Sequence, residues 1–271
     1  MLQTRQNRQF RNYHGIEVLN TEVPRFELGD IRTDYGEALP NHQGIYPEGH
    51  EKGDKPIAIV SDRYELINHN SVFDAIKQTI TDNDYGVEGV KLTATPDYHK
   101  SFITLLFEEC KEAIKVGDIV QFGCKIANGV DGRMSLWGVP FSYRLWCENG
   151  ASHMEELNRI KFKHMTNVNL EDLRDTIELI ISNFSQIASK YREWADTEVI
   201  EMEALDTEGK EWIAKNIPNK YTDIIVAEKP KTAWELFNVL TKSNTHDTRR
   251  NDFTKLMFNR VIANTVDLMI S

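Results

Sequence analysis

A succession of short strand-like runs, separated by turn residues, constrains the fold of this chain more than any other feature. Five runs are rich in β-branched and aromatic residues, and they lie at 87–95, 100–109, 118–128, 134–139 and 141–147. Gly117 separates two of the runs, and the turn at 128–132 (NGVDG) contains both dipeptides that favour tight hairpins. Strands joined in this way pair with their neighbours along the chain, so we expect an antiparallel β-meander.

Helical patterns lie on both sides of the meander. Residues 71–80 predict a short helix with Ser71 as its N-cap, after two short strands at 57–60 and 64–67. Beyond Asn149 and Gly150, apolar side chains recur at helical spacing, and helices are expected at 169–195, 207–216, 232–242 and 247–270. The sequence therefore predicts an α+β fold: an antiparallel β-meander with a short helix, backed by C-terminal α-helices.

Composition divides the chain of 271 residues into three regions. Residues 1–55 are expected to form an N-terminal arm and a long loop, because 20–56 is rich in Gly, Pro, Asn and Asp without sustained periodicity. One short strand is expected there, around 25–28. Residues 56–165 would form the β-meander core domain, and residues 166–271 the helical C-terminal region.

Several classes of protein are excluded by composition. Hydrophobic residues make up 40% and charged residues 27% of the chain, which is typical of a globular protein. The longest apolar runs fall far short of the ~20 residues that span a membrane, and residues 1–10 have no apolar segment typical of a secretory signal. Cys110, Cys124 and Cys147 lack CxxC spacing, which suits a reducing compartment. We therefore expect a cytoplasmic protein without membrane contact.

Motifs for common enzyme chemistry are missing from the sequence. It contains no P-loop, GxGxxG, HExxH, GxSxG or EF-hand pattern. His42 and His50 lie in a polar loop, where such residues are usually solvated. Nothing requires catalysis, and we expect a non-enzymatic protein with no cofactor and no bound metal. The alternative is a metal-dependent nuclease that uses Asp62, Asp131 or Glu148, although each acid lies at an expected turn.

The net charge of −10 argues against a protein that coats nucleic acid with its whole surface. The distribution of charge along the chain is more informative. Residues 1–14 contain three arginines and no acid, whereas 193–211 contains eight acids and Lys210 as the single cation. Near the C-terminus the cations Arg249, Arg250, Lys255 and Arg260 outnumber the acids Asp247 and Asp252. Each run is either a solvated face or a binding surface.

The most suggestive segment for binding lies between residues 141 and 164. Arg159, Lys161 and Lys163 alternate with two apolar residues, so a strand would place the three cations on one face. Cations beside aromatic rings are what a single-stranded nucleic acid needs, for its phosphates and its bases. The predicted nucleic-acid-binding residues are Lys125, Arg133, Tyr143, Arg144, Trp146, Arg159, Lys161, Phe162 and Lys163. The alternative is an ordinary amphipathic strand with its cations in water.

Dispersed positions between about 56 and 262 resemble the pattern of a known family. They are Tyr64, Asn68, Phe73, Gly117, Asp118, Asn128, Asp131, Gly132, Arg144, Cys147, Asn149, Thr232, Ala233, Asn238 and Thr241. The family is a phage and plasmid protein family, catalogued as a domain of unknown function, whose members are encoded by phages, prophages and plasmids. The resemblance implies a mobile-element origin and action in a bacterial cytoplasm, and it implies no established activity. The order of elements is also similar in outline to that of phage single-strand annealing proteins.

Three functions follow as hypotheses. The first is a non-enzymatic phage or mobile-element protein of DNA metabolism, which binds single-stranded DNA as a homo-oligomer and promotes annealing or recombination. The second is a protein-interaction factor, such as an inhibitor of a host defence complex, which the acidic run at 193–211 would suit. The third is the metal-dependent nuclease.

Overall fold

The computed structural model describes residues 11–14, 16–32, 36–144, 149–151, 160–162, 170–250 and 252–270. The strands are β1 (Arg11–His14), β2 (Phe26–Arg32), β3 (Ala38–Pro47), β4 (Ala58–Ser61), β5 (Val87–Ala94), β6 (Lys100–Lys115), β7 (Asp118–Gly129), β8 (Leu136–Arg144), β9 (Asn149–Ala151) and β10 (Ile160–Phe162). The helices are α1 (His69–Asp82), α2 (Glu171–Ser182), α3 (Phe184–Asp196), α4 (Thr207–Asn216), α5 (Asn219–Glu228), α6 (Ala233–Thr245) and α7 (Asp252–Leu268), with short 3-10 turns η1 (Ile16–Asn20) and η3 (Met202–Ala204). The predicted α+β fold, a meander followed by C-terminal helices, is confirmed. Within these ranges no helix combines the length and the apolar character needed to cross a membrane.

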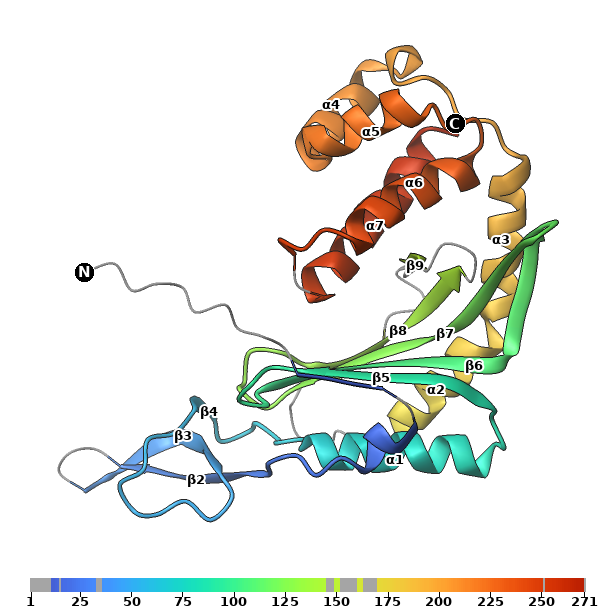
Figure 1. Ribbon diagram of the computed structural model, residues 1–271. Helices are drawn as coiled ribbons and strands as arrows, with labels where there is room; N and C mark the ends of the chain where they lie inside the picture. The colour runs from blue at the N-terminus through green and yellow to red at the C-terminus, as the bar shows by residue number, and fades with distance from the viewer. Residues whose placement is uncertain are drawn as a thin grey trace. The chain divides into compact units, whose positions relative to one another are not determined.

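The meander is the centre of a seven-stranded sheet. Its order is β1-β5-β6-β7-β8-β10, with β9 also paired to β8 (Figure 1). Gly117 connects β6 to β7 with φ of +78°, a left-handed conformation that favours glycine. The predicted runs at 134–139 and 141–147 meet in the single strand β8, because Pro140 fixes φ at a value that extended backbone accepts.

The segment predicted as a long loop contains two strands instead. Strands β2, β3 and β4 form a separate three-stranded antiparallel sheet, with Leu28 opposite Ile45. The strand expected around 25–28 is present as β2, whereas β3 was not predicted. Strand β3 shows no alternation, because its first five residues are exposed and its buried residues are three in a row. Asparagine, as at position 41, also has a low preference for strands.

The strand predicted at 64–67 is irregular in the structure. The side chain of Asn68 makes the hydrogen bonds to Phe26 that a neighbouring strand would otherwise make. Its side-chain amide donates to the carbonyl oxygen of Phe26 (3.0 Å) and accepts from the Phe26 N–H (2.8 Å). One side chain thus replaces a pair of strand hydrogen bonds. Helix α1 begins directly afterwards, with Asn68 and not Ser71 at the N-cap position.

The described chain forms two compact units. Unit 1 contains residues 1–106, 125–138 and 160–179, and unit 2 contains 107–124, 139–159 and 180–271. In unit 1, α1 runs along the sheet (Figure 1) and buries Val72, Phe73 and Ile76. The chain therefore passes from one unit to the other within β6, β7 and β8.

A buried polar contact joins α1 to the sheet inside unit 1. The His69 ring, which is fully buried, donates from Nε2 to the carbonyl oxygen of Tyr98 (2.8 Å). Its Nδ1 lies 2.8 Å from Ser101 Oγ and 3.1 Å from Asn128 Nδ2, so the neutral ring accepts there. Because these partners come from the turn before β6, from β6 and from β7, the contact fixes the helix on the strands.

An aromatic cluster forms the core of unit 2. The Tyr191 ring of α3 is fully buried, and its centroid lies 4.8 Å from that of Trp234 and 5.6 Å from that of Phe237, both on α6. Phe122 of β7 approaches the same ring to 6.0 Å. Tyr191 Oη lies 3.0 Å from Ser142 Oγ of β8, so the hydroxyl is hydrogen-bonded inside the core.

The C-terminal helices differ from the sequence expectation at three points. The helix predicted at 169–195 is divided at Asn183 into α2 and α3. Helix α5 was not predicted, since Tyr221 and Ile225 are its only buried residues and give little periodicity. The last helix begins at 252, not at 247, because a turn at Asp247 precedes it.

We predict that Tyr191→Ala lowers the free energy of unfolding by about 3–5 kcal/mol, because it removes a buried ring and leaves a cavity. Tyr191→Phe should cost only about 1 kcal/mol, the typical value of one hydrogen bond. Urea denaturation followed by tryptophan fluorescence measures both. Equal losses in the two variants would contradict the placement of the ring in the core.

Candidate nucleic-acid interface

The nine predicted nucleic-acid-binding residues fall in different parts of the chain. Unit 1 contains Lys125 on β7, Arg133 in the turn before β8, and Lys161 and Phe162 on β10, whereas unit 2 contains Tyr143 and Arg144 at the end of β8. Trp146, Arg159 and Lys163 lie outside the described residues. The structure therefore describes six of the nine predicted residues, four in unit 1 and two in unit 2.

In unit 1 the predicted cations are distributed over β7, the turn before β8 and β10. Strand β10 pairs antiparallel with β8, so that Lys161 takes the position opposite Trp137. Lys125 is half-buried on β7, the strand on the other side of β8, and Arg133 is exposed. The Arg133 N–H donates to Asp131 Oδ1 (3.1 Å), so the turn that carries this cation is fixed.

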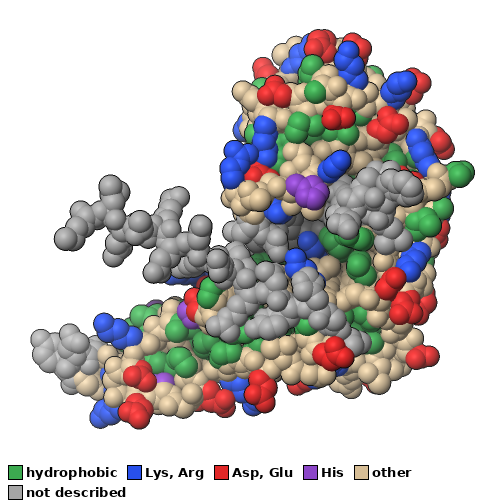
Figure 2. Space-filling model, in the orientation of Figure 1, with side chains coloured by type: hydrophobic (Ala, Val, Ile, Leu, Met, Phe, Trp, Pro, Cys, Tyr) green, Lys and Arg blue, Asp and Glu red, His purple; other side chains and the backbone are tan. Residues whose placement is uncertain are grey.

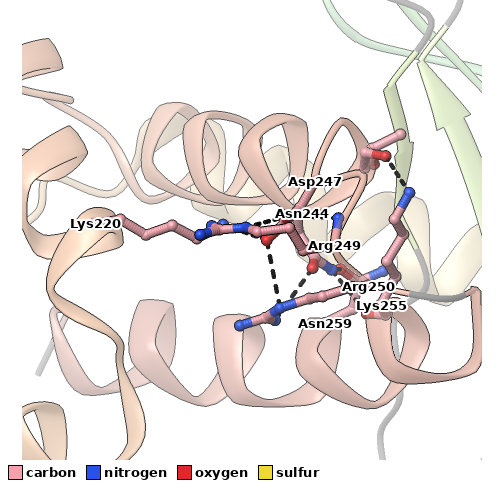
Figure 3. Close-up of polar contacts among 8 residues, drawn as sticks. Lys220, Asn244, Asp247, Arg249, Arg250, Lys255 and Asn259 are labelled. Carbon is pink, nitrogen blue, oxygen red and sulfur yellow. Dashed lines mark hydrogen bonds and ion pairs between the residues drawn. The ribbon is translucent and has the colours of Figure 1, made fainter. Parts of the chain in front are cut away.

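Unit 2 contains a second group of cations, which we name the basic cluster: Lys220, Arg249, Arg250 and Lys255. Three of its members meet the carboxylate of Asp247, whose side chain is 5% exposed (Figure 3). Lys220 forms an ion pair with Oδ2, Arg249 Nε lies 3.1 Å from Oδ1, and Arg250 Nε lies 3.6 Å from Oδ2. The Arg249 side chain is nevertheless 74% exposed. One buried acid thus orients several cations, and one of these points into solvent.

The loop that carries the basic cluster is held by its own polar groups. The Arg249 N–H donates to Asp247 Oδ1 (3.1 Å). Aspartate favours turns that are closed by a hydrogen bond of this kind. Asn244 Nδ2 donates to Asn259 Oδ1 and to the Lys255 carbonyl oxygen, both at 2.7 Å, which connects α6 to α7 (Figure 3). Lys255 Nζ donates to the Thr245 carbonyl oxygen (2.6 Å). These hydrogen bonds therefore fix the main chain that carries Arg249, Arg250 and Lys255.

Aromatic rings lie directly beneath the cations. The Arg250 guanidinium is 3.9 Å from the centroid of the Phe258 ring, and Lys220 Nζ is 4.5 Å from that of the Tyr221 ring. The two rings contact each other at 4.8 Å. Such cation–π contacts keep the charged ends in place.

The electrostatics of the basic cluster follow from these contacts. The hydrogen bonds from Lys220 and from Arg249 hold the pKa of Asp247 well below its usual range. Asp247 in turn raises the pKa of Arg249. Asp247 is therefore ionised at neutral pH, and it leaves the four cations with a positive excess.

The sequence contained part of the signal for this cluster. Arg249, Arg250 and Lys255 belong to the basic run near the C-terminus, but Lys220 lies on α5, the helix that the sequence did not predict. Figure 2 shows Lys and Arg side chains intermixed with Asp and Glu over the C-terminal helices, so the cluster is a local feature of that surface.

The acids proposed for a nuclease are not gathered in the part of the chain that the structure describes. Asp131 lies 3.6 Å from Lys100, Asp62 is exposed in the turn after β4, and Glu148 lies outside the described residues. His50 bonds to Glu27 (2.6 Å), whereas His42 bonds to the Pro40 carbonyl oxygen. Within the described ranges no group of three or more His, Cys, Asp or Glu side chains could hold a metal ion.

Residues of the family pattern mostly make contacts inside the fold. Asp118 accepts a hydrogen bond from Trp234 Nε1 (2.8 Å), which ties β7 to α6. Thr232 caps α6 by accepting from the Glu235 N–H (3.3 Å), and Thr241 Oγ1 donates to the Phe237 carbonyl oxygen. These contacts therefore stabilise the fold.

Comparison with protein families gives one match. Residues 56–264 match the model of a family described as a domain of unknown function, DUF932. No curated protein and no solved structure matches the chain. The match agrees with the resemblance to a domain of unknown function that the sequence pattern indicated over about residues 56–262.

We predict that Asp247→Asn lowers the thermal midpoint at pH 7, because the cations lose their buried counter-charge. The pKa of Asp247 is lowered in the folded protein, so its contribution is complete above the unfolded value of about 4 and is lost as the pH falls further. The difference in thermal midpoint between the original chain and the Asp247→Asn variant should therefore shrink steadily below pH ~4. Circular dichroism at several pH values measures it, with exposed Asp223→Asn as the control. A difference that stays constant down to pH ~2 would contradict the ion pairing.

Proposed function

The chain belongs to the DUF932 family, and from its own residues we propose that it is a non-enzymatic protein of DNA metabolism that binds single-stranded DNA. The observation that carries the proposal is the basic cluster, in which three of the four cations pair with one buried carboxylate. Cations that are already oriented lose little side-chain freedom when they meet a phosphate. A guanidinium that is 74% exposed while its Nε is anchored, as in Arg249, meets this condition.

The net charge of −10 does not oppose a local phosphate site. Screening limits the range of exposed charges to about 8 Å at physiological salt. A phosphate next to Arg249 and Lys255 therefore responds mainly to the basic cluster and to the distant acids only weakly. Low salt extends the range of repulsion from those acids. The affinity for a phosphate therefore depends both on attraction by the basic cluster and on repulsion by the acids.

The cations of unit 1 give the proposal a second part. Lys125, Arg133 and Lys161, with Arg159 and Lys163 from the same stretch of sequence, would contact phosphates along the sheet. Tyr143, Trp146 and Phe162 would stack on bases, and Arg144 would add a cation. This part rests on the strand pattern and on the register of β10 with β8.

The proposal extends to a biological setting through the family resemblance. A homo-oligomer that binds two complementary strands could promote annealing or recombination for a phage or other mobile element in a bacterial cytoplasm. Annealing needs no nucleotide hydrolysis, which agrees with a sequence that has no P-loop.

We predict that Arg249→Gln with Lys255→Gln weakens binding of a fluorescein-labelled single-stranded oligonucleotide. The slope of log K against log salt should fall by roughly 1.4, since each phosphate contact on a single strand contributes about 0.7. Fluorescence anisotropy over a salt series gives the slope. The matched control is Lys210→Gln with Lys215→Gln, two exposed cations of α4 in the same unit. An unchanged slope in the first variant would remove the basic cluster from the interface.

For the segment 159–163 we predict that Arg159→Ala, Lys161→Ala and Lys163→Ala together reduce the same slope by roughly two. The control exchanges Lys52 and Lys55, which are exposed in the turn region before β4, for alanine. If the triple variant keeps the original slope, the sheet cations are solvated residues of an amphipathic strand.

A further inference from the structure

A groove in unit 2 lies between the segment 198–203, which ends in η3, and the carboxyl end of α5 with the loop that follows it. Its volume is about 630 Å³, within the range of about 300–1,000 Å³ that is typical of ligand sites. The segment is held by hydrogen bonds from the Val199 N–H to the Lys231 carbonyl oxygen (3.1 Å) and from the Ile200 N–H to that of Met269 (2.9 Å). The walls are therefore positioned by main-chain contacts.

The floor of the groove is apolar. Six side chains make up this floor: Val199, Ile200, Met202, Ile225, Val226 and Met269. Val226 is 55% exposed, so it presents apolar surface at the groove. Methionine side chains are flexible and polarisable, so Met202 can adapt to apolar groups of different shape.

The rim of the groove is mainly acidic. Glu198, Glu201 and Glu203 line one side and are exposed, whereas Lys229 and Lys231 lie on the other. The acidic side continues beyond the groove, because all eight acids of 193–211 are exposed and Lys210 is the single cation among them. The field near the glutamates is therefore negative and attracts cationic groups.

We propose that this groove binds a short peptide segment of a partner protein, in which one or two apolar side chains stand next to arginine or lysine. The apolar side chains fill the floor beside Val226, and the cations face the three rim glutamates. Electrostatic complementarity of this kind speeds association and selects the partner, while burial of the apolar groups supplies affinity. The site gives a structural basis to a protein-interaction role and does not depend on DNA binding.

Nucleic acid is the wrong chemistry for this groove. Phosphates would face Glu198, Glu201 and Glu203 without enough cations to neutralise them, and the apolar floor offers no large aromatic ring for base stacking. The basic cluster and the groove therefore differ in the class of molecule that they recognise.

The test begins with selection of peptides from a random library displayed on phage, with the full chain as bait. The expected result is enrichment of sequences that combine Leu, Met or Phe with neighbouring Arg or Lys. The most enriched peptide, synthesised with a fluorescein label, then serves as the probe in anisotropy titrations. Val226→Glu should weaken its binding at least tenfold, roughly 1.4 kcal/mol. Val116→Glu is the matched control, because Val116 is a fully exposed valine at the turn between β6 and β7.

A second variant tests the rim without touching the floor. Glu198→Gln, Glu201→Gln and Glu203→Gln together should weaken the peptide several-fold and reduce the salt dependence, whereas Glu208→Gln with Glu211→Gln should leave both within about twofold. The proposal is overturned if the library yields no basic and apolar enrichment. It is also overturned if the enriched peptide binds the Val226→Glu and triple Gln variants as tightly as the original chain. Competition by a single-stranded oligonucleotide for the peptide would likewise count against a separate site.

Discussion

The pairing of β6 with β7 is the interaction on which the rest of the structure depends. This hairpin turns at Gly117, where φ of +78° would strain any residue with a side chain. In unit 1 the hairpin supplies Ser101 and Asn128, which contact the buried His69 of α1. In unit 2 it supplies Phe122, which packs against Tyr191 in the aromatic core. The hairpin therefore supplies residues to the core of each unit.

Unit 2 contains two local groups of charged side chains, one mainly basic and one mainly acidic. The basic cluster gathers cations around Asp247 by using one buried acid as an anchor. The segment 193–211 does the reverse, since its eight acids are exposed with a single lysine among them. A net charge of −10 conceals this separation. Two surfaces of opposite sign suit two classes of partner, a polyanion at the first and a basic peptide at the second.

The sequence predicted the elements with strong local patterns and failed where distant contacts decide. The meander strands and α4 follow from periodicity and turn residues. Strand β3 escaped prediction because its exposed half lacks alternation, and the role of Asn68 depends on Phe26, which is 42 positions away. The basic cluster was visible only in part: Lys220 reaches Asp247 across 27 positions, and no local pattern encodes that ion pair.

The central claim is that this acidic chain binds single-stranded DNA through local cations. The most direct measurement is equilibrium binding of the unmodified chain to a fluorescein-labelled single-stranded oligonucleotide, with duplex DNA of the same length alongside, at about 50 and 200 mM salt. The account predicts that the single strand binds more tightly than the duplex and that its affinity falls as salt rises. Absence of binding at micromolar protein, or an affinity that does not change with salt, would contradict it.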